Sequence, residues 1–324
     1  MKILFIGPVP LSGIGQVMLK YKKVLESRGH TVQYSMYTAN KLPEDYDRCF
    51  VFALPIAPIV QLIPSLKNCT VMTVCETEKM HQNYADLPRN KVIYVPSQFC
   101  RERLERQFPT HTFSVLHHWT EIPKVPCSKQ MVFNDCEYVF YTLGNVKDPR
   151  KNLRLLLEAF VRLNLPKAHL LIKATCIEEL RLNFPWLTVI NGGLISDEEM
   201  DIIHASGDCY VNCSNSEGVG MGAVEAAVRD KPVIVCGYGG ATEYVKTPFV
   251  IDYTVGQIGY DDFLFSSNME WGHPRLESLM GHMKHCYDNR IRTWDHEYTR
   301  QLISSVPPAL EYIVCNPVHS GGGN

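Results

Sequence analysis

The 324-residue sequence lacks long apolar stretches, a strong net charge and closely paired cysteines. Its longest apolar stretches, such as residues 49–64, contain prolines and fall short of the ~20 residues that a membrane-spanning helix needs. Residues 1–7 are strand-like and too short for the apolar core of a secretory signal, so we expect no targeting segment. We therefore expect a cytoplasmic protein, and a weak peripheral contact with a membrane stays open.

The formal net charge of −2 conceals an asymmetry between the two parts of the chain. Residues 1–125 hold 15 Lys and Arg against 10 Asp and Glu, a net of +5, whereas the remainder holds 17 against 24, a net of −7. The basic footprint of a nucleic-acid-binding protein is absent, so we expect no nucleic-acid partner. The basic first part fits an anionic acceptor or a membrane surface, and ordinary surface variation is the simpler explanation.

Twelve cysteines are scattered along the chain without a C-x-x-C pair. Cys49, Cys75 and Cys236 lie in strand-like segments, where cysteine behaves as a small buried hydrophobe. We expect reduced thiols and no disulfide framework. The D-x-D of residues 45–47 is expected to be a solvated turn, and the two histidines at 282 and 285 a helix surface, so no metal site is predicted.

Strands alternate with helices in two successive series, and a chain of this length favours two domains. The first series is expected at residues 2–6, 14–25, 31–37, 48–54, 70–75, 91–96, 98–107 and 113–116. The second series is expected at residues 138–143, 152–163, 168–174, 188–190, 197–205, 208–213, 220–229 and 232–236, and a helical segment begins near residue 275. Turn-rich residues 121–129 are the predicted link. This alternation predicts an α/β protein with two doubly wound, Rossmann-like domains facing a cleft, and ligands at the carboxyl ends of the strands.

The most informative segment is S-N-S-E-G-V-G-M-G-A-V-E at residues 214–225, between an expected strand and an expected helix. Glu217 and Glu225 are eight residues apart, about 12 Å along a helix, which suits the two ends of an extended ligand. Glycines 218, 220 and 222 allow close backbone approach, and a helix start attracts an anion. A nucleotide-sugar, with a diphosphate between its sugar and its ribose, meets these requirements.

This segment, with K-P-V-I at 231–234 and G-G-A-T-E at 239–243, resembles the GT-B glycosyltransferases of the large retaining family 4 (glycosyl transferases group 1). The resemblance covers about residues 1–260. It implies that Glu217 contacts the donor sugar, that Glu225 contacts the ribose, and that Gly218, Val219 and Gly220 belong to the donor site. It also implies that the domain at 1–125 lies on the acceptor side, that the domain at 126–290 lies on the donor side, and that the final helices in 291–324 cross back. The tail at 319–324 is expected to be disordered.

The segment G-N-V-K-D-P-R-K-N at residues 144–152 matches the place where the family has an Arg and a Lys on the diphosphate. Lys151 matches the Lys, and Asn145 stands at the position of the Arg. Asn donates a hydrogen bond but carries no charge. Arg150 or Lys147 is expected to compensate, or donor affinity is low.

Three further positions carry weaker signals. Gly13 and Gly15 form a G-x-G loop after the first strand, and the missing third glycine, replaced by Met18, argues against a nicotinamide-dependent enzyme. The resemblance implies that this loop approaches the donor or the acceptor, and a plain tight turn remains an alternative. Glu76 is similar to an acceptor-side acid of some members, and His118 matches a family histidine; a solvated Glu and a structural His are the alternatives.

The resemblance implies an enzyme that moves a sugar from a UDP- or GDP-sugar to a hydroxyl of a glycan, a lipid or another acceptor. Retention of anomeric configuration and independence of metal and cofactor are expected, with Glu217, Lys151 and Glu76 as the catalytic residues. Two alternatives stay open: a nucleotide-sugar epimerase of the same fold, and a non-catalytic nucleotide-sugar-binding module. The base, the sugar, the acceptor and the oligomeric state are not encoded in these patterns.

Overall fold

The computed structural model describes residues 1–39, 41–175, 179–193, 195–262 and 264–316. Its contacts divide the chain into two compact units. Unit 1 comprises residues 1–120 and 257–270 with the described part of 302–324, and unit 2 comprises 121–256 and 271–301. The segment predicted as a link, 121–129, groups with unit 2. The tail at 319–324, expected to be disordered, lies outside the described residues.

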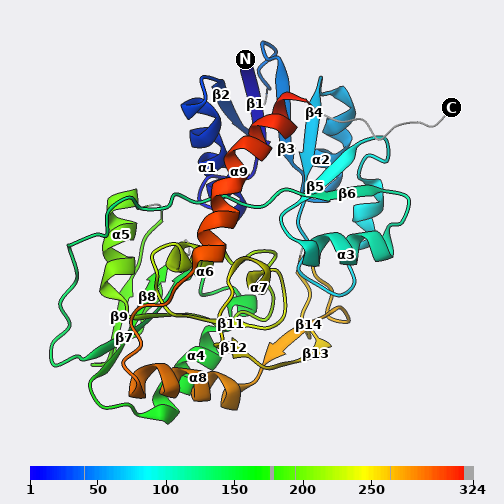
Figure 1. Ribbon diagram of the computed structural model, residues 1–324. Helices are drawn as coiled ribbons and strands as arrows, with labels where there is room; N and C mark the ends of the chain where they lie inside the picture. The colour runs from blue at the N-terminus through cyan, green and yellow to red at the C-terminus, as the bar shows by residue number, and fades with distance from the viewer. Residues whose placement is uncertain (40, 176–178, 194, 263, 317–324) are drawn as a thin grey trace. The chain divides into compact units, whose positions relative to one another are not determined.

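Unit 1 is built on a six-stranded parallel sheet with strand order β2-β1-β3-β4-β5-β6 (Figure 1). Its elements are β1 (Lys2–Gly7), α1 (Gly13–Ser27), β2 (Thr31–Met36), β3 (Arg48–Phe52), α2 (Ala57–Leu62), β4 (Cys69–Met72), β5 (Val92–Val95), α3 (Gln98–Gln107) and β6 (Thr112–Val115). β1, β3 and β4 are apolar along most of their length because a parallel sheet is covered on both faces.

Unit 2 is built on a second six-stranded parallel sheet, with strand order β12-β11-β10-β7-β8-β9. Its elements are β7 (Tyr138–Gly144), α4 (Leu153–Leu163), β8 (Ala168–Ala174), β9 (Leu187–Ile190), α5 (Asp197–Ser206), β10 (Cys209–Asn212), α6 (Met221–Ala227), β11 (Val233–Cys236), α7 (Ala241–Tyr244), β12 (Val250–Ile251) and α8 (Leu276–Asp288). The predicted doubly wound α/β fold is confirmed by the two parallel sheets.

The strand order of unit 2 fixes where a ligand site belongs. β8 and β9 extend the sheet from β7 in one direction, and β10, β11 and β12 extend it in the other. The strand order therefore reverses between β7 and β10, where Tyr141 is paired with Tyr210. The crossover helices leave a crevice at the carboxyl ends of two such strands, and ligands of doubly wound sheets bind there.

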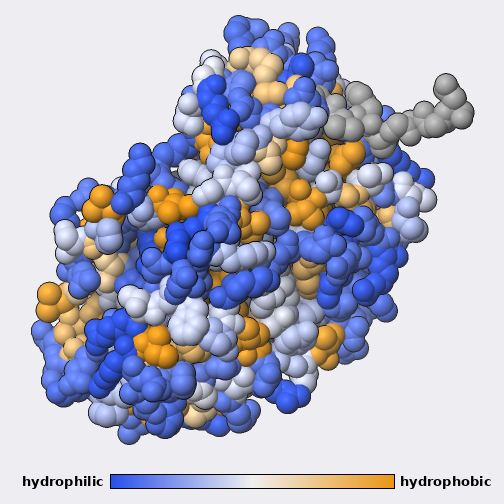
Figure 2. Space-filling model, viewed as in Figure 1, coloured by the Kyte–Doolittle hydropathy of each residue, from blue (hydrophilic) through white to orange (hydrophobic). Residues whose placement is uncertain are grey.

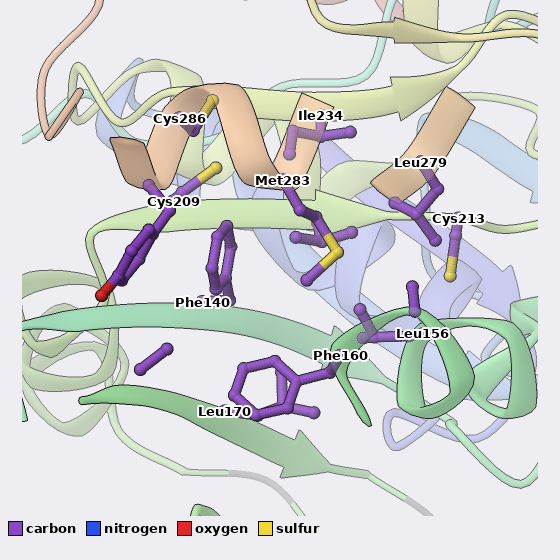
Figure 3. Close-up of a cluster of buried hydrophobic side chains, with 14 of the residues drawn as sticks. Phe140, Leu156, Phe160, Leu170, Cys209, Cys213, Ile234, Leu279, Met283 and Cys286 are labelled. Carbon is purple, nitrogen blue, oxygen red and sulfur yellow. The ribbon is translucent and has the colours of Figure 1, made fainter. Parts of the chain in front are cut away.

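The core of unit 2 is a cluster of side chains from the sheet and from α4 and α8, which Figure 3 shows meeting in one layer. Phe140 of β7 lies edge-on to Phe160 of α4, with ring centroids 6.3 Å apart. Leu279 and Met283 of α8 are fully buried in the same cluster. Burying side chains of this size contributes about 1.5–3 kcal/mol each, which holds both helices on the sheet.

Several helix ends show defined caps. Ser196 and Glu199 form a capping box at the start of α5. Ser97 caps α3, and its hydroxyl accepts a hydrogen bond from the amide of Cys100 at 3.3 Å. Gly29 follows α1 with a φ of +84°, a backbone conformation that glycine adopts without strain.

Other elements were not predicted. α2 is a six-residue helix with proline in its first turn, inside the apolar run 49–64. A two-stranded sheet joins β13 (Tyr253–Gln257) and β14 (Glu270–Pro274). The expected helical end is two helices, α8 and α9 (Glu297–Cys315), and α9 contains Pro307 and Pro308.

The described cysteines are all unpaired, and most are buried. No helix among residues 1–39, 41–175, 179–193, 195–262 and 264–316 combines the length and the apolar character that crossing a membrane requires. On the face that Figure 2 shows, hydrophobic residues are interspersed among hydrophilic ones. Large apolar side chains such as Val132 and Tyr312 are exposed, which is ordinary for isolated residues on a protein surface.

Candidate functional site

The site lies in unit 2, in the loop that leads from β10 to α6. The loop leaves β10 at Asn212, whose side-chain oxygen accepts a hydrogen bond from the amide of Ser214 at 3.0 Å. Its middle is fixed by the carbonyl of Glu217, which accepts from the amide of Gly240 at 2.8 Å. These bonds place the side chain of Glu217 beside the strand-order reversal.

Glu217 is buried and surrounded by donors. Its Oε1 accepts from the Lys151 ammonium at 2.5 Å and from the Ser214 hydroxyl at 2.8 Å, and its Oε2 accepts from Arg150 Nη1 at 3.1 Å. Only 10% of the side chain of Glu217 is exposed. A carboxylate with this little water needs such partners, because an isolated buried charge is strongly disfavoured.

The electrostatics of the cluster keep Glu217 ionised. Burial raises the pKa of Glu217, but the charges of Lys151 and Arg150 and the hydrogen bonds from Lys151 and Ser214 outweigh it and lower the pKa to about 2. At neutral pH the side chain is therefore a pure hydrogen-bond acceptor. It can bind hydroxyl groups and cations, and it has no proton to donate.

The two cations are positioned by a short turn after β7. Residues Pro149–Lys151 form one turn of 3₁₀ helix, capped by Asp148, which accepts from the amide of Arg150 at 2.9 Å. Asp148 also lies 3.3 Å from the guanidinium of Arg150. Two hydrogen bonds then join this turn to the Glu217 loop: Asn152 Nδ2 donates to Asn215 Oδ1 at 3.0 Å, and the amide of Asn215 donates to the Arg150 carbonyl at 2.8 Å.

Two glycines let the surrounding backbone approach the cluster. A Cβ atom on Gly239, whose φ is +104°, would lie 2.6 Å from the carbonyl oxygen of Glu217. A Cβ atom on Gly222 would lie 2.2 Å from the hydroxyl of Tyr210. Both distances are far inside van der Waals contact, so a larger residue at either position would displace the site.

Glu217 and Lys151 line a small pocket of about 30 Å³ together with Thr142 of β7, Asn212 of β10 and Gly220. The pocket lies at the carboxyl ends of β7 and β10, where the topology predicts a ligand. Ligand pockets usually measure 300–1,000 Å³. This pocket therefore holds one functional group, and a ligand as large as a nucleotide-sugar extends beyond it.

The structure brings the side chains of Glu217, Lys151 and Arg150 together, and their predicted role in binding a donor stays a prediction. Gly218, Val219 and Gly220 form the end of the same loop, and Gly220 precedes α6 with a φ of +78°.

Glu225 and Asn145 are not among the hydrogen-bond partners of Glu217 described above. Glu225 is half-buried in α6, and its charge acts on the hydroxyl of Tyr210, as that of Glu217 does. Asn145 is exposed, and Arg150 rather than Asn145 provides the cation at Glu217.

The other predicted residues lie in unit 1. Gly13 begins α1, and the amide of Gly15 donates to the hydroxyl of the capping Ser12 at 3.0 Å. Glu76 is half-buried in the segment after β4. His118 is only 5% exposed and packs against Tyr21 and Phe52, with ring centroids 6.1 Å away in both cases. Burial, followed by the charges of His117 and Lys20, lowers the pKa of His118 to about 3, so its imidazole is neutral.

Sequence reasoning missed Ser214 and the Asn152–Asn215 pair. Ser214 precedes Glu217 by three residues, so its hydroxyl can reach the carboxylate within one loop. A single serine is too common in loops for its position in the sequence to predict this contact. The asparagine pair joins residues 63 positions apart and becomes visible only in three dimensions.

In the described part of the chain, no group of three or more His, Cys, Asp or Glu is placed to hold a metal ion. His282 is half-buried rather than on the helix surface, and its Nε2 lies 2.9 Å from the carbonyl oxygen of Val250. Asp45 is exposed, as expected, and it pairs with the ammonium of Lys2.

Known proteins match this chain in two ways. Residues 128–251 match the family model of glycosyl transferases group 1. Among solved structures, the sucrose-phosphate synthase of Thermosynechococcus elongatus is similar, with a TM-score of 0.66, 12% identity, and coverage of 96% of each chain. A glycosyltransferase from Rickettsia africae has a TM-score of 0.61 at 13% identity, covering 98% of this chain and 93% of its own.

A third similar structure is WaaG, a glycosyltransferase involved in lipopolysaccharide biosynthesis, with a TM-score of 0.61, 12% identity, and coverage of 99% of this chain and 100% of its own. No curated protein sequence matches the chain. Identities this low show the fold alone, whereas the family match covers the Glu217 loop, the Lys151 turn and both strands at the reversal. The chain therefore has the GT-B fold, and its residues 128–251 match the glycosyl transferases group 1 family.

Proposed function

We propose that this protein transfers a sugar from a nucleotide-sugar to a hydroxyl group of an acceptor. The observation that carries the proposal is the buried Glu217 carboxylate, held by Lys151 and Arg150 at the strand-order reversal of a group 1 domain. A buried acid beside two cations fits a ligand with hydroxyl groups at one end and a diphosphate next to them.

The cations are suited to the diphosphate leaving group. The positive charges of Arg150 and Lys151 balance the negative charges of Glu217 and Asp148, so the resting cluster is neutral. An ammonium has three N–H donors, and Lys151 uses one of them on Glu217. Its other donors are able to bind phosphate oxygens while Glu217 stays in place, and they stabilise the charge that develops as the glycosidic bond breaks.

Glu217 is suited to hold the sugar and not to move a proton. Its lowered pKa, about 2, leaves it ionised throughout the neutral range. An ionised carboxylate accepts hydrogen bonds from two sugar hydroxyls and fixes the ring relative to the leaving group. We assign to Glu225 the ribose end of the donor, one helix turn beyond the pocket.

The finer parts of the proposal follow from the same assignment. The two cations supply the positive charge that a metal ion provides elsewhere, so transfer needs neither metal nor a separate cofactor. We propose a UDP- or GDP-sugar as donor, retention of anomeric configuration, and a glycan or lipid acceptor, with Glu76 of unit 1 as an acceptor-side acid. Transfer rates in EDTA and in excess Mg²⁺, with the product anomer determined by NMR, test these points.

The experiment is a nucleotide-release assay on a panel of UDP- and GDP-sugars, with and without glycan and lipid acceptors. We expect acceptor-stimulated release of the nucleoside diphosphate by the wild type. Glu217→Gln and Lys151→Met are each expected to lower that rate by about 10²–10³-fold, the usual cost of removing one electrostatic contact to a transition state. Lys284→Met, which removes an exposed lysine paired with Asp288, is the matched control.

Wild-type rates in either folded variant would contradict the assigned roles. Conversion of the donor sugar without any acceptor would instead identify an epimerase. Donor binding without release of nucleotide would identify a non-catalytic binding module. Circular dichroism and thermal unfolding of each variant show whether a lost rate reflects a lost fold.

A further inference from the structure

Unit 2 contains a second cavity, of about 240 Å³, that shares no lining residue with the Glu217 pocket. Its walls come from the segment around Pro123 and Pro126, from α5, and from the turn between α6 and β11. Met221 at the start of α6 lines the Glu217 pocket, whereas Val228 just after its end lines the second cavity. The two cavities thus lie at opposite ends of α6.

The second cavity combines apolar walls with several charged groups. Pro123, Pro126, Ala205 and Val228 provide the apolar surface. Asp201, Arg229, Asp230 and Lys231 provide two charges of each sign. Apolar walls with a few placed polar groups are the usual composition of a small-molecule site.

Three of the four charges already have partners. Arg229 Nη2 and Nε donate to Asp201 Oδ1 at 2.5 and 3.0 Å, and Arg229 Nη1 donates to the carbonyl of Glu225 at 2.8 Å. Asp230 is paired with Arg300. These groups are therefore neutralised within the protein, and the carboxylates keep lone pairs that can accept from ligand hydroxyls.

Lys231 is the exception. Its ammonium has no hydrogen bond or ion pair with any residue that the structure describes, although the side chain is half-buried. The carboxylate whose charge acts on it, Asp208, already accepts from the amide of Val139 at 2.8 Å and pairs with Arg292 at 3.3 Å. Burial and the nearby charge of Arg292 lower the pKa of Lys231, and the charge of Asp208 only partly offsets this. Lys231 therefore contributes to the cavity wall a cation without an ion pair among the described residues.

We propose that this cavity is a binding site for a small hydroxylated anion, a polyol phosphate or a sugar acid, whose acid group pairs with Lys231. The volume is smaller than that of a site for a drug-sized ligand, so the ligand is a compact molecule of a few carbon atoms. Asp201 and Asp230 accept from its hydroxyl groups, and the proline-lined wall covers its carbon chain. The site is separate from donor binding.

The test is calorimetric titration of the whole protein with glycerol 3-phosphate, with glycerate and with uncharged glycerol. We expect one or both anions to bind and glycerol not to bind. Lys231→Gln should weaken anion binding at least tenfold, whereas Lys231→Arg, which keeps the charge, should restore most of it. Lys284→Gln removes an exposed lysine elsewhere in unit 2 and should leave the affinity unchanged.

A second variant tests the cavity without changing its charge. Ala205→Leu fills part of the cavity that Lys231 also lines. This variant should abolish anion binding while its temperature of unfolding stays that of the wild type. Unchanged affinity in folded Lys231→Gln would overturn the proposal, as would the absence of binding by both anions. Loss of binding in Lys151→Gln together with retention in Lys231→Gln would place the anion in the Glu217 pocket and would equally overturn it.

Discussion

At the scale of single residues, the site depends on how one carboxylate is held. Glu217 accepts hydrogen bonds from two cations, Lys151 and Arg150, and from one neutral group, the hydroxyl of Ser214. The hydroxyl differs from the cations in its effect. A hydroxyl contributes a hydrogen bond to a charged group, worth about 1.5–3 kcal/mol, without changing the net charge of the cluster. It therefore serves to orient the carboxylate between Lys151 and Arg150.

Ser214→Ala should lower the rate of sugar transfer about tenfold, because the oxygen that also binds Lys151 loses its fixed position. Ser216→Ala is the matched control two residues away. Ser216 is fully buried, and its hydroxyl has no hydrogen-bond partner among the described residues. Steady-state rates for the two variants check this, and equal effects would mean that the Ser214 contact has no orienting role.

His118 provides a pH-dependent prediction in unit 1. The unfolded chain binds a proton at this residue below about pH 6.5, whereas the buried imidazole stays neutral until about pH 3. The unfolded state therefore binds more protons in this window, and the free energy of unfolding falls by up to ~1.4 kcal/mol per pH unit as the pH drops. His118→Gln should remove the part of this decrease in the free energy of unfolding that comes from protonation of His118 in the unfolded chain.

Urea unfolding at pH 7.5 and pH 5.0 measures the effect. The wild type should lose up to about 2 kcal/mol more than His118→Gln between the two values. An identical pH dependence in the two proteins would show that His118 is protonated in the folded state. That result would favour the ligand-contacting role that the family resemblance implies for His118.

Glu217 and Lys151 could be selected from the sequence because each lies within a short, recognisable motif. Glu217 and Lys151 stand in segments whose glycines and charges have a recognisable spacing. The place of Arg150 followed less directly, since the resemblance pointed to position 145 and the structure brings Arg150 to Glu217. The capped turn at 149–151 directs the side chain of Arg150 toward Glu217. The pattern of residue types alone does not specify that direction.

At the scale of elements, glycines decide whether the Glu217 loop can adopt its path. Gly239 combines a positive φ with a close approach to the backbone of Glu217. Gly239→Ala should therefore destabilise unit 2 by about 2 kcal/mol or more and displace the loop. Gly281→Ala in α8, where a Cβ meets nothing within 4 Å, should be neutral or stabilising by up to about 1 kcal/mol.

Thermal unfolding with nucleotide-release rates for the two variants checks the prediction. A folded Gly239→Ala protein with wild-type rates would show that the loop tolerates a shift, and the site would then not depend on this contact.

Elements with a strong apolar period were predicted well, and weakly patterned ones were not. β8 was expected over its observed length, because all seven of its residues are buried. β13 was missed because its residues are mostly exposed, so it shows neither an apolar run nor alternation. α2 was missed because six residues with a proline carry too little helical period to separate from an apolar strand.

At the scale of the whole molecule, the make-up of each unit depends on contacts between distant parts of the sequence. Residues 302–316 group with unit 1, where Glu311 pairs with His30 at 3.0 Å and Thr70 donates to the carbonyl of Ile313 at 3.3 Å. Residues 257–270 also group with unit 1. Local patterns do not encode such contacts. The crossing back of the final helices was expected only from the family resemblance, and it stays a prediction.

The most direct test of the central claim is calorimetric titration of the wild type and of Lys151→Met with UDP, GDP, ADP, dTDP and CMP. We predict that at least one nucleoside diphosphate binds the wild type. Its affinity should fall by about 10–100-fold in Lys151→Met, equivalent to about 1.4–2.8 kcal/mol, and stay unchanged in Lys284→Met. Absence of binding by every nucleotide, or equal affinity in wild type and Lys151→Met, would contradict the claim that the cluster of Glu217, Lys151 and Arg150 binds a diphosphate.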